Sequence, residues 1–341
     1  MGCEEDHRTN TKSETMKMRE IEWKSLSRYR GELMGAAIIF IILFHVGLPR
    51  NDAFFGLKRC GNIGVDMFLF LSGIGLWFSW VRNPHTWQFY KRRLLRIFPA
   101  WLIMSSLYYI PRFDWHTGSV LDLVLDITIN WDFWLHDELT FWYIPAIMML
   151  YLWAPWYMRL IQKSPSFRWL PVLMMGWCVC VQWVIPIHDA VGHIEIFWSR
   201  VPIFFLGINC GEWIRTDRKM EPAAIWLLLI TFVATASACV YLEQVRHGRF
   251  PLFAERMIYI PLTVSMLLLL ARLFQHAPSW VNKASALLGT ISLELYLIHA
   301  HFVMAYISPY HLGYWPTVML TILFAVPLAW LLHKLIEWVM P

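Results

Sequence analysis

Ten long runs of apolar residues, separated by short polar stretches, set the pattern of this chain. A helix needs about 20 mainly apolar residues to cross a bilayer, and each run is close to that length. The pattern therefore predicts an all-α, polytopic membrane protein with about ten transmembrane helices. The predicted spans are 33–49, 62–81, 94–111, 141–159, 169–187, 197–214, 222–242, 257–275, 285–306 and 314–338.

The composition leaves little room for a soluble domain. Only 16% of the residues are charged, whereas soluble domains carry about 25%. We predict a flexible cytoplasmic tail over residues 1–28 and one transmembrane domain over residues 29–341. The net charge of +5 is modest and no nucleic-acid-binding signature is present. No metal is expected, because the cysteines lack the spacing and the His partners of a zinc site.

Basic residues in the short loops predict the orientation, because cytoplasmic loops are enriched in Lys and Arg. Such clusters precede the first span and follow spans two, four and six, which places both termini in the cytoplasm. The opposite side includes segment 112–140, which has six acidic residues against one Arg and room for a short amphipathic helix. Two loops on this outer side break the rule. They carry Arg50, Lys58 and Arg59, and Arg246, Arg249 and Arg256.

A histidine and a carboxylate interrupt the first two apolar runs at matching depth. His45 lies about one turn from the outer end of the first span, and Asp66 about one turn into the second. Such residues are costly in a membrane and are often functional. A carboxylate that accepts from one imidazole nitrogen leaves the other free to take a substrate proton. The alternative is a polar pair that only joins the two helices, worth about 1 kcal/mol.

Four further residues are predicted in the same outer layer. Arg200 opens the sixth span, where it either faces an oxyanion or an anionic acceptor or extends to the lipid headgroups. His299 is a candidate second acid or base, or a helix-packing donor. Trp142 and Tyr143 open the fourth span at its outer edge.

Two polar neighbours of His299 are assigned elsewhere. His301 is predicted to point away from His299, because two residues turn an α-helix by roughly 200°. Glu294, deeper in the same span, is expected to be a structural partner of a neighbouring helix.

On the predicted cytoplasmic side, opposite the outer layer, lies the basic run YKRRLLRIFP at residues 90–99. It suits an anchor to anionic lipid. Arg92 and Arg96 are four residues apart and share a helix face, and together with Arg93 they are suited to gripping phosphates. A nucleotide-bearing acyl donor from the cytoplasm fits this charge. The chain has no P-loop and no G-x-G-x-x-G motif.

On these residues the chain resembles the acyltransferase-3 family of integral membrane acyltransferases. The matching stretches are LFHVG at 43–47, GNIGVDMFLFLSGI at 61–74, YKRRLLRIFPAW at 90–101, FWYIPAIMMLYLWAPW at 141–156, RVPIFFLGI at 200–208 and LGTISLELYLIH at 288–299. Many family members have an arginine eleven residues before the histidine, where this chain has Met34. Arg30, one turn nearer the cytoplasm, is the candidate replacement.

The resemblance implies an acyl-CoA-dependent O-acyltransferase in the cell (inner) membrane, with acetyl-CoA or another acyl-CoA as donor. His45, oriented by Asp66, would act as general base on a hydroxyl of an extracytoplasmic or lipid-linked glycan, or would carry the acyl group transiently. The donor phosphates would lie on Arg92, Arg93, Arg96 and Arg30. The alternatives are a flippase or transporter of a lipid-linked sugar and a non-catalytic membrane sensor.

Overall fold

The computed structural model describes residues 21–136, 138–216, 220–246 and 249–340, and every regular element in these ranges is helical. The prediction of an all-α protein is confirmed. The first half contains α2 (Lys24–Arg28), α3 (Arg30–His45), α4 (Phe55–Arg59), α5 (Ile63–Arg82), α6 (Thr86–Tyr109), α7 (Val120–Ile129), α8 (Trp131–His136) and α9 (Tyr143–Lys163). The second half contains α10 (Leu170–Trp183), α11 (Ile185–Val191), α12 (Glu195–Trp198), α13 (Val201–Arg215), α14 (Pro222–Val245), α15 (Leu252–His276), α16 (Ser279–Thr290), α17 (Ser292–Ile298), the π-helix His299–Met304, α18 (Ala305–Ile307) and α19 (Tyr314–Val339).

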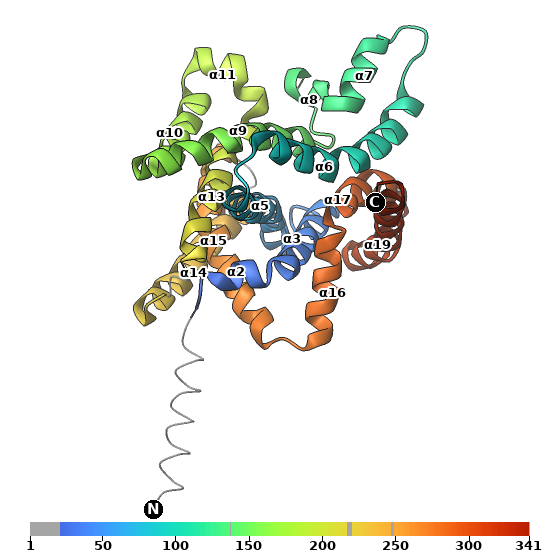
Figure 1. Cartoon of the computed structure of the whole chain (residues 1–341). Helices are drawn as coiled ribbons and strands as arrows, with labels where there is room; N and C mark the ends of the chain where they lie inside the picture. Colours follow the sequence, from blue (N-terminus) through green and yellow to red (C-terminus); the bar gives the residue numbers. More distant parts are fainter. Residues whose placement is uncertain (1–20, 137, 217–219, 247–248, 341) are drawn as a thin grey trace, which may run out of the picture.

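Helices α3 and α5 lie at the centre of the bundle, and the other long helices surround them (Figure 1). The reason is visible in the sequence of α5, which is apolar on all sides and has 15 buried residues out of 20. A helix that is hydrophobic all round belongs in the interior.

Within the described residues, six helices are long and apolar enough to cross a membrane, by length and composition. They cover Phe55–Arg82, Thr86–Arg112, Tyr143–Lys163, Ala223–Val245, Leu252–His276 and Tyr314–Val339. Two bent helix pairs raise the number to as many as eight. Helices α3 and α13, both predicted as spans, have 16 and 15 residues. The total of ten spans and the cytoplasmic location of the termini stay predictions.

Two predicted spans are broken. The chain bends by 94° between Trp183 and Ile185, within the predicted span 169–187. Val184 at the bend is extended, and Pro186 lies in the first turn of the new helix α11, where its missing N–H is tolerated. The predicted span 285–306 bends by 64° between Thr290 and Ser292.

Glycines allow the central helices to approach their neighbours. A Cβ added at Gly35 of α3 would clash with the carbonyl oxygen of Ser285 in α16. A Cβ at Gly207 of α13 would clash with the carbonyl oxygen of Phe70 in α5. Small residues at such contacts are typical of helix packing in membranes, where backbones must come close.

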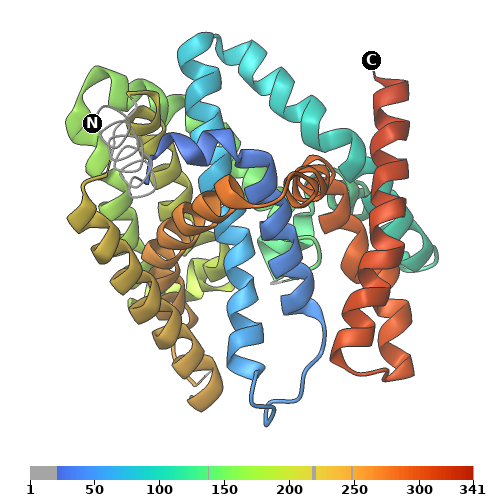
Figure 2. The same ribbon diagram turned by 90° about the horizontal axis from the view of Figure 1, so that it is seen from below.

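The first residue and the last residue of α3 mark the two ends of the bundle. Helix α2 and the C-terminal end of α19 lie at the end that holds Arg30, whereas the loops after α3 and after α14 lie at the end that holds His45 (Figure 2). We call these the Arg30 end and the His45 end. Residues 21–28, predicted within the flexible tail, pack against the bundle, since Leu26 is fully buried. The rest of the predicted tail, residues 1–20, lies outside the described residues.

Segment 112–140 contains the expected short helix. The hydroxyl of Ser119 accepts from the amide of Asp122 at the start of α7, and Asn130 ends the helix with a left-handed φ of 52°. Asp126 faces inward and accepts from the amide of Asp132 at 2.9 Å. Burial raises the pKa of the Asp126 carboxyl to about 6, and the charge of Asp132 adds to this shift.

Candidate functional site

A cavity of about 320 Å³ at the His45 end is lined by three of the outer-layer residues predicted from the sequence, His45, Trp142 and His299. Asp66, Arg200 and Tyr143 are not among its lining residues. Segments from distant parts of the chain line it: the end of α3, the 3₁₀ turn before α5, the start of α9, the start of α15 and the π-helix after α17. Its polar side chains come from His45, Arg59, Asn62, Trp142, Glu255, Arg256, Tyr296, His299 and His301.

His45 contacts His299 rather than a carboxylate. Its Nδ1 lies 2.8 Å from the carbonyl oxygen of Ile41 and 3.3 Å from Nε2 of His299. Nδ1 of His299 lies 2.9 Å from the carbonyl oxygen of Leu295 and 3.0 Å from that of Tyr296. The sequence pattern alone did not pair these two histidines, which are 254 residues apart.

The carbonyl partners determine the tautomers when both rings are neutral. A carbonyl oxygen only accepts, so Nδ1 of each histidine carries the proton. His299 then presents the lone pair of Nε2 to the N–H of His45, which this donor shares with Ile41. The remaining nitrogen of His45, Nε2, is therefore unprotonated. His45 is an exposed side chain that lines the cavity, so the arrangement suits it as a base or nucleophile.

His301 lines the same cavity as His299, so the expected separation of the two is wrong. The helix changes to π geometry at His299, and π segments recur at functional sites. Three successive residues, His299 to His301, face the cavity, which therefore covers a broad arc of this helix. His301 packs its ring on Phe141, with centroids 4.6 Å apart.

Asp66 pairs with Arg200, and the predicted hydrogen bond from His45 to Asp66 is absent. Oδ2 of Asp66 lies 3.5 Å from Nε of Arg200, and both side chains are only 1% exposed. Neither carboxylate oxygen has a hydrogen-bond partner among the described residues. A buried guanidinium close by offers the strongest stabilisation for a buried carboxylate, which explains the choice of partner. Asp66 does not orient His45 in this structure.

Arg200 is held on three sides. It donates from Nη2 to the Asn62 side chain at 3.0 Å, and its guanidinium lies over the Trp142 ring at 5.0 Å from the centroid. These contacts and the Asp66 pair bury Arg200 against Asn62 and Trp142, which line the cavity, so its side chain does not extend out of the bundle. Tyr143, next to Trp142, instead lines a second cavity, where its amide donates to the hydroxyl of Tyr296 at 3.3 Å.

The second cavity, of about 250 Å³, contains the predicted donor-binding arginines, with one correction. Arg30, Arg93 and Arg96 line it, and Arg93 has a buried Nε without a partner. Arg92 is exposed, and it lines neither this cavity nor the larger cavity at the Arg30 end. The helix face directed inward thus holds Arg93 and Arg96, three residues apart, and not Arg92 and Arg96.

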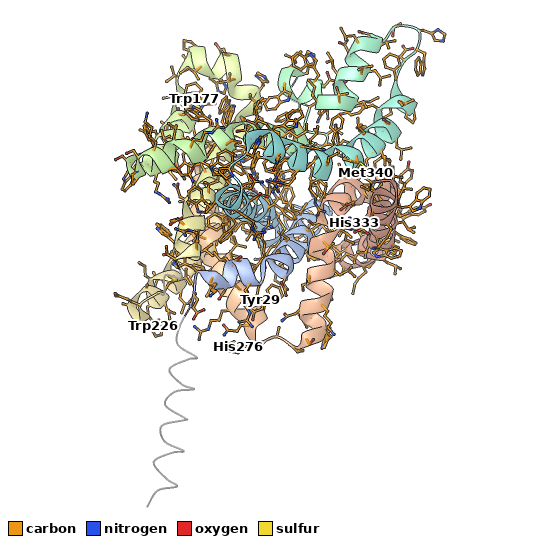
Figure 3. The ribbon with its side chains drawn as sticks, in the orientation of Figure 1. Tyr29, Trp177, Trp226, His276, His333 and Met340 are labelled. Atoms are coloured by element: carbon orange, nitrogen blue, oxygen red, sulfur yellow. The ribbon has the colours of Figure 1, made fainter. Side chains whose placement is uncertain are left out.

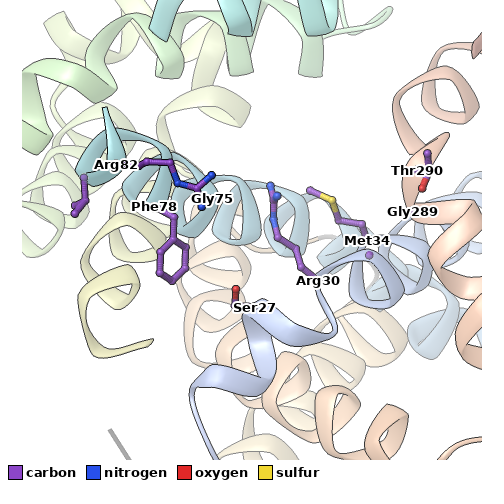
Figure 4. A pocket seen from close by; sticks show the side chains of 10 residues that line it. Ser27, Arg30, Met34, Gly75, Phe78, Arg82, Gly289 and Thr290 are labelled. Atoms are coloured by element: carbon purple, nitrogen blue, oxygen red, sulfur yellow. The ribbon is translucent and has the colours of Figure 1, made fainter. Parts of the chain in front are cut away.

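The two cavities and a third one form a series through the bundle. The third, of about 650 Å³, lies at the Arg30 end and opens between α3, α5 and α16 (Figure 4). It shares Arg30 and Met34 with the second cavity, which in turn shares Ile41 and Tyr296 with the His45 cavity. Met34 and Arg30 extend from the same face of α3 in Figure 4, as expected for residues four apart.

Glu294 is a structural partner of α19, as predicted. Its Oε1 lies 2.8 Å from Nδ1 of His333, which Figure 3 labels on α19. Both side chains are buried, and they face away from the cavities that their neighbours line.

Five polar residues of this cavity were not predicted from the sequence: Arg59, Asn62, Glu255, Arg256 and Tyr296. A signal for two of them was present, because Arg59 and Arg256 belong to the outer loops that break the distribution of positive charges. Asn62 and Glu255 gave no comparable signal, since a single polar residue at a helix end is common.

The apolar helices indicate a multi-pass membrane protein, with a series of cavities inside the bundle. Residues 35–334 match the acyltransferase-3 family, described as an acyltransferase domain. The match covers nearly the whole chain, so the chain belongs to this family and the resemblance noted in the sequence is confirmed.

A regulator of hypoxia-inducible factor 1 from Caenorhabditis elegans is 30% identical to this chain over the matched region. The match covers 38% of this chain and 34% of the nematode protein, so the chain spans about a third of the length of this relative. No solved structure matches the chain.

Proposed function

We propose that the protein transfers an acyl group, acetyl in the first instance, from acyl-CoA to a hydroxyl of an extracytoplasmic or lipid-linked glycan. The observation that carries this proposal is the series of three cavities, with arginines in the first half and the histidine pair at the far end. Family membership supports acyl transfer in general.

The donor fits the arginine cavities. Arg30, Arg93 and Arg96 supply charge-assisted donors for phosphates, and Nε of Arg93 has no protein partner. CoA enters from the Arg30 end, which we assign to the cytoplasm. Its acyl arm passes Ile41 and Tyr296, which line both adjoining cavities, and places the thioester beside His45.

The chemistry is a direct transfer with His45 as base. Nε2 of His45 takes the proton of the acceptor hydroxyl as its oxygen attacks the thioester carbonyl. The carbon–sulfur bond then breaks, and the proton passes to the departing CoA thiolate, giving an ester and free CoA. His299 stabilises the protonated His45, because a lone pair at 3.3 Å accepts a stronger hydrogen bond from a charged ring. Positioning and proton transfer together account for the expected acceleration.

The same scheme assigns ten spans with both termini in the cytoplasm of a cell (inner) membrane protein. The short α3 and α13 and the two bent pairs complete the ten. His45 then faces the extracytoplasmic side, opposite to the donor.

Sealed inside-out vesicles test the proposal, with radiolabelled acetyl-CoA added outside. We expect label on material in the lumen, resistant to an added esterase until detergent opens the vesicles. Vesicles with His45→Ala give the background. Label removed without detergent would place the acceptor on the donor side, and label no higher than the background would reject acyl transfer.

A further inference from the structure

The His45 end carries an excess of positive charge that the proposed reaction does not use. Residues 50–59 and 243–256 contain six Lys and Arg and three acids. Outer loops normally contain few basic residues. Basic residues that are retained in outer loops against this tendency are candidates for binding an anionic molecule.

The two segments form one surface. The side chain of Gln244 donates to the carbonyl oxygen of Asp52 at 2.9 Å and accepts from the amide of Gly56 at 2.7 Å. Arg59 also reaches across, with Nε 3.2 Å from Glu243. These bonds join the loop after α3 to the end of α14, at the same end of the bundle in Figure 2.

Three arginines of this surface form no ion pair with any residue that the structure describes. Arg50, Arg246 and Arg249 are all exposed, and they line a hollow of about 590 Å³. Glu243, an acid of this surface, pairs instead with Arg59. The hollow therefore presents three uncompensated positive charges at the outer mouth of the bundle.

Helix α15, which follows this surface in the chain, contributes to the His45 cavity. Arg256, seven residues after Arg249, is 5% exposed and lines the cavity wall. Its Nη2 lies 4.0 Å from Glu195, and its Nε and Nη1 have no hydrogen-bond partner in the part of the chain that the structure describes. A buried guanidinium with two free donors needs acceptor oxygens, which the protein itself does not supply.

We propose that the acceptor carries an anionic group, a phosphate or a carboxylate, that binds at the Arg50–Arg246–Arg249 hollow while its reacting hydroxyl enters the cavity beside Arg256 and His45. This inference rests on the proposed function and narrows its acceptor to an acidic molecule. Focused positive charge raises the local concentration of an anion and favours its encounter with the site. A lipid-linked phosphate and an acidic sugar share this chemistry.

The charge of the product tests the inference. Membranes containing the protein are incubated with radiolabelled acetyl-CoA and soluble cell extract, and background from His45→Ala membranes is subtracted. The labelled product should bind an anion-exchange resin at neutral pH. Partition into organic solvent then separates a lipid-linked acceptor from a water-soluble one. Label in the unretained neutral fraction overturns the inference but leaves acyl transfer intact, whereas the absence of label above background rejects the proposed function and the inference with it.

Substitution of the hollow provides a second readout. The triple variant Arg50→Gln, Arg246→Gln and Arg249→Gln should raise KM for the purified acceptor about ten-fold, an effect that corresponds to about 1.4 kcal/mol, with kcat unchanged. Added salt should reduce the difference from the wild type. The matched control, Lys163→Gln with Lys283→Gln, removes exposed charges that line none of these cavities. Equal KM values for the triple variant and the wild type would show that the arginines do not bind the acceptor.

Discussion

Replacing His299 by Phe should slow catalysis without weakening donor binding. The ring of His299 is 1% exposed, so Phe fills the same space. The variant loses the lone pair that accepts from Nδ1 of His45 at 3.3 Å. Ile41 still holds the Nδ1 proton at 2.8 Å, so the tautomer of His45 is retained. For His45, the substitution therefore removes only the stabilisation of its protonated ring by His299.

The size of the effect follows from that single bond. A hydrogen bond to a charged group contributes about 1.5–3 kcal/mol, which corresponds to about a 10- to 150-fold reduction in kcat. Removing the base itself, by His45→Ala, should cost more, about 10²- to 10⁴-fold. KM for acetyl-CoA should stay within about two-fold, because the arginines lie in a different cavity.

The assay is the release of free CoA by purified protein in nanodiscs, with kcat and KM measured separately. His299→Gln, whose amide oxygen also accepts, should recover part of the rate. His276→Phe is the matched control, since His276 is an exposed residue at the edge of the bundle, labelled in Figure 3. An unchanged kcat in His299→Phe would refute the role of the histidine pair, as would a loss confined to KM.

Three further predictions concern charged residues. Arg93→Gln should raise KM for acetyl-CoA about ten-fold or more in the same assay. Arg92→Gln should not, because of these two arginines only Arg93 lines the second cavity, where we propose that the donor binds. Asp66→Asn should lower the unfolding free energy by about 3–5 kcal/mol in denaturant titrations, because it leaves Arg200 unpaired. The double variant Asp66→Asn with Arg200→Met should recover much of this loss. Additive losses from the two substitutions would contradict the buried pair. Asp126, with a folded pKa of about 6 against about 3.9 unfolded, stabilises α7 fully below about pH 4 and loses this effect as pH rises through 6. Amide exchange in α7, corrected for intrinsic rates, should be slower at about pH 5 than at about pH 7.5, and Asp126→Asn should remove the difference.

The sequence predicted the depth of the polar residues better than their partners. Hydrophobic runs place a residue along a helix, so the layer of His45, Asp66 and His299 could be predicted. Which side chains meet depends on the rotation of each helix. The rotation of α5 turns Asp66 toward Arg200, and the rotation of α17 brings His299 to His45.

The same limit applies to the arginines and to the helix breaks. A helical wheel shows that Arg92 and Arg96 share a face, but the packing of α6 directs Arg93 and Arg96 inward. The mean hydropathy of a segment does not depend on whether its helix is straight, so the 94° and 64° bends within the apolar segments could not be predicted from it. The family resemblance, by contrast, made Arg30 a candidate, and Arg30 lines the second cavity together with Met34, Arg93 and Arg96.

The central claim is that His45 acts as the base in transfer from acyl-CoA. Its most direct test is the rate of CoA release by the purified protein with acetyl-CoA and acceptor, compared with His45→Ala, together with acetyl-CoA binding to both. We predict a loss of about 10²-fold or more in rate with unchanged binding. A His45→Ala protein that turns over at the wild-type rate would contradict it.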